Sequence, residues 1–492
     1  MRLLAAGAVA LGVVATGWAL YAAAHPAWWL LYPADLKVYW DGGLIARHAG
    51  SSYDPTLAGP LYGWASPTGL KFTYPPFAAV AFGAVSVLPW WALPRLSEAV
   101  GVAALGVAAW FTMAGLGYTS RRARLGGALL GTAAGLATEP VFRTLYLGQV
   151  NLILMALIVW DLTRPADPDG KGWSGLATGV AAGIKLTPLV FIPYLLATRR
   201  LRQAGLAAAG FAATVAVGFV AMPRNSAEWW LHGLFLDGGR TGFVGWGGNQ
   251  SLYGLITRLS GSLSAATPVW IAAALVVAAV GLLSAAVLSR AGHPVLGILV
   301  TALVGLLDSP VSWDHHWVWV VPGVLAAAHY AARAWAGGRL RAAAGCAATA
   351  AFLLLVMFPW PGGLWSVTTT GPGNFTSGLL WAAPNSPVWC YVRLGDKPWF
   401  LEYHWRGPQV LAGNAYVLTG LAALVALTAL AGWLTGRLRV GWLRAGWLTG
   451  GPGALRGDRV RARCPAQPLP ERPARRPGGD VPAAATPRDL DP

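Results

Sequence analysis

Apolar runs dominate the chain from residue 3 to about residue 436, and short polar stretches separate them. Lipid hydrocarbon offers no partner to open backbone groups, so a run that lies in it must be helical. The ten-residue alternation of apolar and polar positions that a membrane β-barrel requires is not visible in the sequence. The pattern therefore predicts an all-α polytopic membrane protein, whose first helix covers residues 3–24.

Several runs are shorter than the roughly 20 residues that a straight crossing needs. These short runs cover residues 125–138, 150–162, 174–186 and 188–198. Broken helices of this length are tolerated in a membrane where they line a cavity or pack against protein. Together with the longer runs they predict a bundle of about 12 transmembrane helices. The longer runs cover 95–117, 203–222, 266–288, 294–307, 317–333, 342–360 and 409–436.

The charged residues indicate the orientation of this bundle. Only 11% of the residues are charged, against about a quarter in soluble domains, yet the formal charge is +17. Much of the excess lies after residue 436 and in arginine clusters between apolar runs, a distribution typical of cytoplasmic loops and not of a nucleic-acid-binding surface. We expect membrane lipids and no nucleic acid as partners, a cell-membrane location and both termini in the cytoplasm. The clusters are Arg121, Arg122 and Arg124; Arg199, Arg200 and Arg202; Arg333, Arg339 and Arg341; and Arg437 and Arg439.

The first outer loop, residues 25–94, contains an apolar run that does not fit as a full crossing. Two crossings between this loop and Arg121 would place that arginine cluster outside the cell. The run 74–91 opens with Pro75 and Pro76 and ends in a proline and two tryptophans. We therefore expect it to be a re-entrant or interfacial helix at the outer face of the membrane.

Composition divides the chain into two parts. Residues 1–436 form the predicted transmembrane domain. Residues 437–492 are rich in proline, arginine and alanine without helical periodicity, and we expect a disordered cytoplasmic tail that anionic lipid attracts. Cys346, Cys390 and Cys464 lie in an apolar run, a polar loop and this tail, so no disulfide framework is expected.

Under this topology the unusual polar residues gather on the outer face. The stretch ADLKVYWDGG (34–43) follows the first helix, a polar turn is expected over 139–151, and Lys185 lies in a helix break. The polar stretches 223–250 and 308–316 fall on the same side. Their tryptophans and tyrosines fit either an aromatic belt at the lipid headgroups or stacking on sugar rings, and composition leaves both interpretations open.

Six segments occur in a fixed order between about residues 25 and 330. They are DLKVYWDGG (35–43), FTYPPFAAVAF (72–82), LGQVNLIL (147–154), AAGIKLTPLVFIPYLL (181–196), GGNQSLYGL (247–255) and SPVSWDHHWVW (309–319). Together they resemble the actinobacterial GT-C membrane glycosyltransferases of family 87, α-mannosyltransferases that take mannose from polyprenyl-phosphate-mannose. The ordered set is far more specific than any one segment.

The resemblance implies a GT-C-like catalytic bundle over residues 1–436. It implies an inverting transfer of mannose on the outer face of the membrane, without a metal or other cofactor. The donor would be a polyprenyl-phosphate sugar, and the acceptor a glycolipid or glycan of the cell envelope, such as a phosphatidylinositol mannoside.

The resemblance also implies that an aspartate of the first outer loop acts as general base, and its position in DLKVY makes it Asp35. A positioned carboxylate that takes a proton in the transition state contributes about 10²- to 10⁴-fold to the rate. The alternative role for Asp35 is to cap a short helix that begins at Leu36. Asp41 is the second candidate for the base.

The leaving phosphate needs hydrogen-bond donors or cations at the outer membrane surface. Lys185 in IKLTP and the adjacent His315 and His316 in WDHHW are the best-placed candidates. Adjacent histidines on a helix do not face one point, so we expect one of them at the phosphate and the other behind it, with Asp314 holding an imidazole tautomer. The alternative for Lys185 is that it lies at a helix end and reaches water.

The remaining polar and aromatic candidates are assigned to the mannose or to the acceptor. Asparagine and glutamine read sugar hydroxyls, but they cap broken helices equally often, so both roles stay open. WDHHW lacks the His-x-x-x-His or paired-acid spacing of a metal site, so no metal is expected. The sugar- and acceptor-binding candidates are Tyr39, Asp41, Tyr74, Gln149, Asn151, Asn249, Gln250, Trp313 and Asp314.

Two alternatives to mannose transfer remain. A related enzyme of the same class transfers another polyprenyl-phosphate sugar, such as arabinofuranose. A secondary transporter or lipid flippase also uses short, interrupted helices, but it needs ionisable groups near the midplane that both sides reach. In this chain such groups cluster at the outward helix ends, which favours the glycosyltransferase.

Overall fold

Helices make up nearly all of the regular structure in the computed structural model of the chain, which describes residues 2–24, 33–48, 61–63, 70–164, 172–360, 378–386 and 400–448. No β-strand occurs among these residues, and the antiparallel bridge that joins Asn249 to Trp313 is isolated. The all-α class predicted from the apolar runs is confirmed for the described part of the chain.

The helices of the first half of the chain, with short 3₁₀ or π helices written η, have the following bounds. They are α1 (Arg2–Ala24), α2 (Ala34–His48), α3 (Pro76–Val85), α4 (Leu93–Gly115), α5 (Arg121–Leu136), α6 (Glu139–Leu147), α7 (Asn151–Thr163), α8 (Leu176–Ile184), η2 (Thr187–Val190), α9 (Phe191–Ala197) and α10 (Leu201–Ala221).

The second half continues with helices of more varied length. They are α11 (Pro223–Ser226), η3 (Ala227–Leu231), η4 (Leu234–Leu236), η5 (Gly238–Thr241), α12 (Leu252–Ser260), α13 (Leu263–Arg290), α14 (Pro294–Asp308), η6 (Asp314–Trp319), α15 (Val320–Ala336), α16 (Leu340–Val356), η7 (Leu379–Ala382), η8 (Leu401–His404), α18 (Pro408–Gly413) and α19 (Ala415–Leu448).

Four of the described helices are long and apolar enough to cross a membrane: α4, α10, α13 and the first part of α19. The pair α6 and α7 would make a fifth span if it counts as one helix, but it bends by 117° at its break. Shorter apolar helices of 10–17 residues accompany them, among them α14 and α16. A helical membrane protein with broken helices is therefore confirmed, and the total of about 12 spans stays a prediction.

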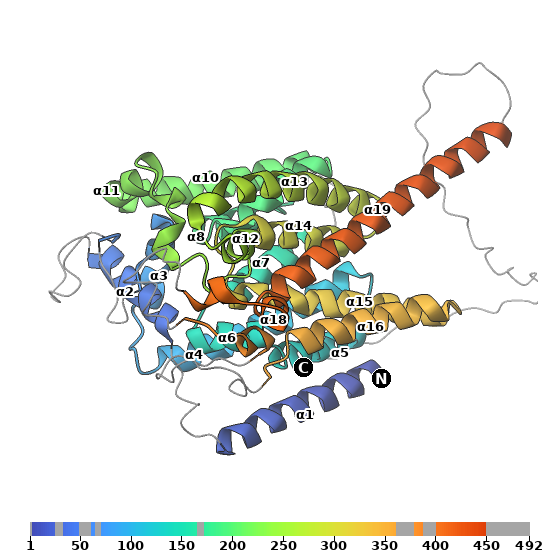
Figure 1. The fold of residues 1–492 in the computed structure, drawn as a ribbon, viewed down its shortest axis with the longest axis horizontal. Helices are drawn as coiled ribbons and strands as arrows, with labels where there is room; N and C mark the ends of the chain where they lie inside the picture. Colours follow the sequence, from blue (N-terminus) through green and yellow to red (C-terminus); the bar gives the residue numbers. More distant parts are fainter. Residues whose placement is uncertain are drawn as a thin grey trace, which may run out of the picture. The chain divides into compact units, whose positions relative to one another are not determined.

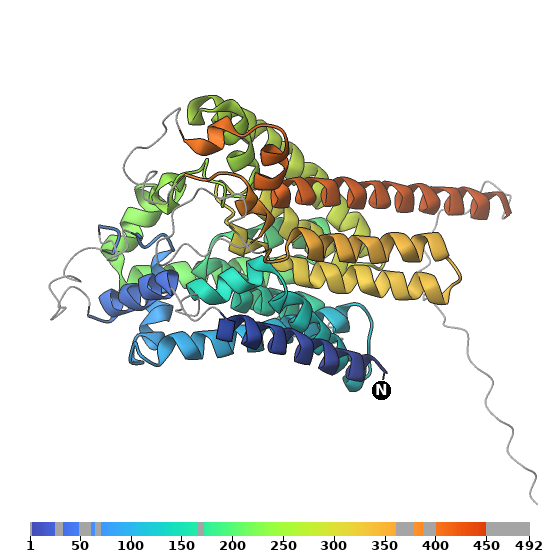
Figure 2. The same cartoon turned by 60° about the horizontal axis from the view of Figure 1, so that its bottom comes forward.

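Packing of neighbouring helices, parallel in some pairs and antiparallel in others, builds the body of the unit formed by residues 1–440 (Figures 1 and 2). Helix α1 packs on α5, α4 on both α5 and α7, α8 on α10, α13 on α14, and α15 on α16. The pair α2 and α3 lies at one end of this body, and the turn between α15 and α16, with Arg339, lies at the other (Figure 1). The arginine cluster and the first outer loop are thus at opposite ends, as the charge pattern predicted.

Helices α2 and α3 are held together by their own cluster of buried residues. The Tyr39 ring stacks on the Phe82 ring at a centroid distance of 4.4 Å. Gly43 lets the two backbones approach, because a Cβ atom there would lie 2.4 Å from the Phe82 carbonyl oxygen. This packing fixes the orientation of the α2 first turn, which carries Asp35.

Three helices differ from the sequence-based expectation. The stretch 139–151, predicted as a turn, forms helix α6 before its turn, so that prediction is wrong. Helix α2 has 15 residues in place of a short segment, and α12 was not predicted. All three are rich in polar residues, which hides them from a search for apolar runs, yet each packs against protein.

The C-terminal part of the chain is described only up to residue 448. Helix α19 continues past residue 437, where the disordered tail was predicted to begin. The predicted disorder of the remaining tail lies outside the described residues.

Candidate functional site

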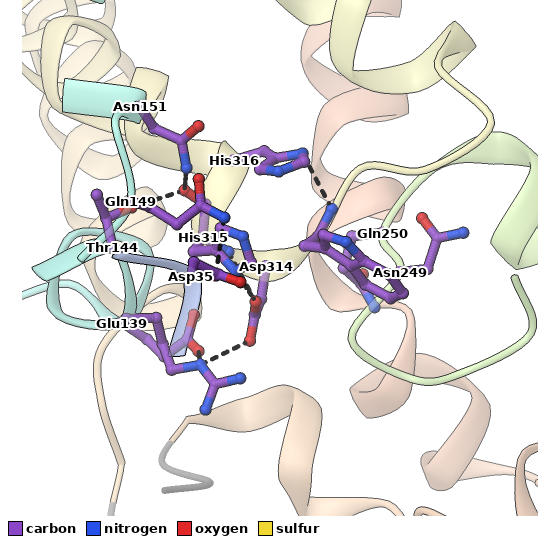
Figure 3. Close-up of polar contacts among 12 residues, drawn as sticks. Asp35, Glu139, Thr144, Gln149, Asn151, Asn249, Gln250, Asp314, His315 and His316 are labelled. Carbon is purple, nitrogen blue, oxygen red and sulfur yellow. Dashed lines mark hydrogen bonds and ion pairs between the residues drawn. The ribbon is translucent and has the colours of Figure 1, made fainter. Parts of the chain in front are cut away.

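Four segments that are far apart in the sequence meet at the ends or breaks of their helices. Figure 3 shows the polar side chains of three of them. The four segments are the first turn of α2, the break between α6 and α7, the break between α8 and η2, and the 3₁₀ helix η6. Each break frees backbone groups and presents polar side chains, which an uninterrupted membrane helix would not do. The cluster of polar side chains at this meeting point is the candidate site.

Asp35 is held from the α6–α7 break by Gln149. The Gln149 side-chain nitrogen Nε2 donates to Asp35 Oδ2 at 2.8 Å (Figure 3), and Gln149 Oε1 accepts from the Tyr39 hydroxyl at 2.6 Å. The Tyr74 hydroxyl lies 2.8 Å from that of Tyr39. Burial raises the pKa of both tyrosines, so each hydroxyl keeps its proton and donates. The tyrosines thus orient the amide, and the amide orients the carboxylate.

Gly148 makes this approach possible. It ends α6 in the left-handed conformation with φ of 70°, and a Cβ atom there would lie 2.6 Å from the Leu36 Cβ of α2. Only glycine adopts this backbone without strain and leaves room for α2. Asp35 follows Ala34, where α2 begins, so it lies inside the first helical turn and is not the residue that precedes the helix. This position, with its bond to Gln149, weighs against a role as helix cap.

Lys185 lies in the extended break after α8, outside the helices that are long enough to cross a membrane. Its ammonium nitrogen Nζ lies 2.9 Å from Asn151 Oδ1 and 2.9 Å from His316 Nε2. Burial lowers the pKa of Lys185 to about 7, although the charge of Asp35 acts in the opposite direction. Burial, Lys185 and His315 together lower the pKa of His316.

His315 belongs to a buried network behind these groups. Its ring nitrogen Nδ1 lies 3.0 Å from Asp314 Oδ1, so the carboxylate holds the imidazole as the sequence predicted. Arg143 Nε lies 3.2 Å from Asp314 Oδ2 and 3.6 Å from Glu139 Oε1. Burial alone would raise the pKa of Asp314, but the charge of Arg143 and the contact with His315 hold it well below its usual range.

Two further side chains fix the backbone of η6. Thr144 Oγ1 and Asn151 Nδ2 both donate to the His315 carbonyl oxygen, at 2.8 and 2.9 Å (Figure 3). Tyr416 of α19 donates its hydroxyl proton to Glu139 Oε2 at 2.9 Å. The position of both histidines therefore depends on α6, α7 and α19.

A cavity opens next to Lys185 and His316, and the space within it, open solvent included, is about 530 Å³. Its polar end is formed by Lys185, His316, Asn151 and Ser312. Apart from Thr187 and Gly305, its other walls are apolar and come from α7, η2, α9, α14 and η6; they are Leu154, Met155, Ile158, Pro188, Val190, Phe191, Ala302, Leu306, Val318 and Trp319. A ligand with a polar, anionic head and an apolar chain fits this division.

Asn249 and Gln250 lie apart from this cluster (Figure 3) and are fully buried. The Asn249 amide donates to the carbonyl oxygens of Val244 and Pro310 and accepts from the backbone nitrogens of Ser251 and Ser312. Every hydrogen-bonding position of this amide is therefore occupied.

Gln250 is bound in the same way. Its Nε2 donates to the Gly247 and Gly413 carbonyl oxygens, and its Oε1 accepts from the backbone nitrogens of Tyr416 and Val417. Both amides bind backbone groups beside helix ends, which agrees with the alternative that they cap broken helices, and neither has a group left for a sugar hydroxyl.

Two more candidates occupy the margin of the site. Asp41 is buried and forms an ion pair with Lys37 of the same helix. Trp313 is half-buried, packs edge-on against Trp246 at a centroid distance of 5.5 Å, and pairs through its backbone with Asn249. Its backbone N–H donates to His316 Nδ1 at 3.2 Å.

The structure thus brings together most of the predicted site residues, and it adds others. The cluster contains Asp35, Tyr39, Tyr74, Gln149, Asn151, Lys185, Asp314, His315 and His316. The residues that the prediction did not assign to the site are Glu139, Arg143, Thr144 and Tyr416. The sequence could have indicated Glu139 and Arg143. Two ionisable residues four apart in a mostly apolar region are rare in membranes unless they serve a site.

No group of three or more metal-ligating side chains that could hold an ion occurs among the residues that the structure describes. The prediction that the chemistry needs no metal or cofactor stays a prediction.

Comparisons with known proteins agree on one family. The model of glycosyltransferase family 87 matches residues 72–310. The chain is 33% identical over 409 residues to the polyprenol-phosphate-mannose-dependent alpha-(1-2)-phosphatidylinositol pentamannoside mannosyltransferase of Mycobacterium tuberculosis strain CDC 1551, covering 82% of this chain and 83% of that protein. It is 31% identical over 413 residues to the protein of the same description from Mycolicibacterium smegmatis, covering 82% of this chain and 87% of that protein.

A second description occurs among the similar proteins. The polyprenol-phosphate-mannose-dependent alpha-(1-2)-phosphatidylinositol mannoside mannosyltransferase of Mycobacterium tuberculosis strain H37Rv is 36% identical over 285 residues, covering 54% of this chain and 65% of that protein. No solved structure gives a significant match.

Proposed function

The chain belongs to glycosyltransferase family 87, and we propose that it transfers mannose from polyprenol-phosphate-mannose to a phosphatidylinositol mannoside. The family makes the protein a glycosyltransferase, and the curated relatives are α-mannosyltransferases. Their descriptions support the choice of donor and acceptor for this chain. They include two different phosphatidylinositol mannoside acceptors, so the number of mannoses on the acceptor is left to the assay below.

The observation that carries the proposal is the cavity with Lys185 and His316 at its polar end. A polyprenyl phosphate has the matching form, since its phosphate needs cations or donors and its chain needs apolar walls. In the proposed arrangement the phosphate lies against Lys185, Asn151 and His316, and the first isoprene units lie along α7, η2 and α14. The sugar then lies toward Asp35, whose charge acts directly on Lys185.

Asp35 is the proposed general base. An acceptor hydroxyl is a weak nucleophile, and Asp35 takes its proton as the new bond forms between the hydroxyl oxygen and C1 of mannose. The bond from C1 to the phosphate oxygen breaks on the opposite side, which inverts the configuration at C1. The leaving phosphate gains negative charge, which Lys185 and the donors around it stabilise.

A transfer assay tests the donor and the acceptor. Membranes that contain the protein are supplied with labelled polyprenyl-phosphate-mannose and a phosphatidylinositol mannoside extract, and the labelled glycolipid is quantified. We expect label in a glycolipid with one more mannose than its precursor, and no label with the Asp35→Asn variant. Transfer from labelled polyprenyl-phosphate-arabinofuranose, and none from the mannose donor, would contradict the proposed donor.

We also propose that the site faces the outside of the cell and that the arginine-rich turns face the cytoplasm. The native cysteines are first replaced. A single cysteine is then introduced at one of two exposed positions: Asp237, in the predicted outer stretch 223–250, or Arg339, in the turn between α15 and α16. A membrane-impermeant thiol reagent added to intact cells is expected to label position 237 and not position 339. Labelling of position 339 alone would reverse the proposed orientation.

A further inference from the structure

The hydrogen bonds of His316 determine where its proton lies. The backbone N–H of Trp313 donates to His316 Nδ1 at 3.2 Å, a bond that a dashed line marks in Figure 3. A backbone amide nitrogen only donates, so Nδ1 must offer its lone pair. A neutral imidazole that accepts at Nδ1 carries its proton on Nε2.

The contact between His316 and Lys185 then has only one consistent assignment. His316 Nε2 and Lys185 Nζ are 2.9 Å apart. An ammonium group has donors and no lone pair, so it would place its protons against the Nε2 proton. A neutral amine has a lone pair that accepts from Nε2–H, and it still donates a proton to Asn151 Oδ1 at 2.9 Å.

The surroundings agree with a neutral amine. Among the described residues, the titratable groups that face Lys185 are Asp35 of α2, which is anionic, and His316 of η6 and the Tyr74 ring at 6.0 Å, which bring no negative charge. Burial lowers the pKa of Lys185 to about 7, so both forms of the amine are accessible near neutral pH. An isolated lysine keeps its proton far above this range.

We propose that Lys185 is a neutral amine held by His316 in the empty site, and that the site takes up one proton when the donor phosphate binds. This inference rests on the proposed function, because the donor phosphate is the anion at the polar end of the cavity. His316 acts here as a positioning residue: it holds the amine by donating to it and does not bind the phosphate as a cation.

Proton uptake matches the charge changes of the reaction. The donor is a phosphodiester with one negative charge, which a newly formed Lys185 ammonium neutralises on binding. Transfer leaves a phosphate monoester with up to two negative charges, because its second pKa is about 6. The ammonium stabilises this added charge as it develops. When the lipid phosphate leaves, the ammonium loses its proton and the neutral pair with His316 forms again.

The proposal fixes the sign of the pH dependence. Well below pH 7 the amine is already protonated, so donor binding takes up no proton and the donor affinity does not change with pH. Above pH 7 the proton must be acquired on binding, so the dissociation constant of the donor rises by up to about tenfold per pH unit. The rise ends only above the pKa of Lys185 in the complex.

The test is calorimetric titration of the full-length protein with polyprenyl-phosphate-mannose in the absence of acceptor. The diester does not titrate in this range, and without acceptor no mannose is transferred. At pH 8, two buffers with different ionisation enthalpies report the number of protons bound. We expect a value close to one at pH 8 and close to zero at pH 6. Tight binding at pH 8 with no proton uptake overturns the proposal and leaves the donor assignment intact.

Three variants test whether the proton uptake depends on the pair Lys185 and His316. Lys185→Arg keeps a permanent cation at the phosphate, so proton uptake at pH 8 is expected to vanish and donor affinity to become independent of pH. His316→Asn removes the donor to the amine and is expected to reduce the uptake at pH 8. His293→Asn, a histidine that contacts Tyr330 outside the site, is the matched control and should behave as wild type. Absence of donor binding at every pH would contradict the donor itself, and this proposal with it.

Discussion

Replacing Asp35 with asparagine is expected to lower the rate of mannose transfer about 10²- to 10⁴-fold and to leave donor binding nearly unchanged. Asparagine has the same shape and is tolerated in the first turn of α2, but it does not accept a proton from the acceptor hydroxyl. The loss should therefore appear in kcat, with little change in the KM for polyprenyl-phosphate-mannose. The labelled-donor assay, run with saturating acceptor, measures both constants.

Asp41 offers a matched control for this variant. It lies on the same helix, and Asp41→Asn makes the same chemical change, but its carboxylate is paired with Lys37. We expect Asp41→Asn to retain most of the activity. If Asp41→Asn loses transfer and Asp35→Asn retains it, the base has been assigned to the wrong residue of α2.

A third variant tests how the carboxylate is held. Gln149→Ala removes the amide that joins the Tyr39 hydroxyl to Asp35. A base that is present but not oriented still accepts protons, so its loss in kcat should be smaller than that of Asp35→Asn. In the double variant the two losses are not expected to add, because Gln149 acts through Asp35.

Much of the fold could be predicted from the sequence because apolar length is a physical requirement of the bilayer. The runs at 203–222 and 266–288 became α10 and α13 with nearly the same bounds. Helices such as α6 could not be found in this way. Five of its nine residues are apolar, but its buried face includes Glu139, Arg143 and Thr144, whose partners lie on η6 and α19.

Only some residues of the candidate site could be singled out from the sequence. Charge beside apolar segments indicated Lys185, since such a residue needs a partner, whereas Asp35 was assigned through the family resemblance. The amides were not distinguishable from one another in the sequence. Gln149 contacts the candidate base, whereas Gln250 is bound on all sides by backbone groups. Only the tertiary contacts decide between these roles, because the side chains are chemically identical.

The second large effect is expected for Arg143→Met, which should destabilise the folded protein by about 3–5 kcal/mol. Arg143 is buried between two carboxylates, those of Glu139 and Asp314. Methionine fills much of the volume of the arginine side chain but removes its charge, so the buried Asp314 carboxylate would lose its cation in a place away from water. The unfolding temperature of the purified protein in detergent measures the loss.

Compensating substitutions separate the charge from the packing. In the triple variant Glu139→Gln, Arg143→Met and Asp314→Asn, no uncompensated charge remains, and the amides still accept from Tyr416 and His315. Replacement of a buried ionic group by neutral residues of similar volume is often tolerated, so most of the lost stability should return. Transfer activity should not return, because Asp314 no longer holds the His315 ring as a carboxylate.

The same substitution at an exposed arginine is the control for Arg143→Met. Arg95 forms an exposed ion pair with Glu98 in α4, with 70% of the arginine side chain exposed. Arg95→Met makes the same substitution where water screens both charges, so the unfolding temperature should hardly change. If Arg143→Met unfolds at the same temperature as Arg95→Met, the buried arginine does not hold the two carboxylates together. The position of His315 would then depend on its hydrogen bonds with Thr144, Asn151 and Asp314.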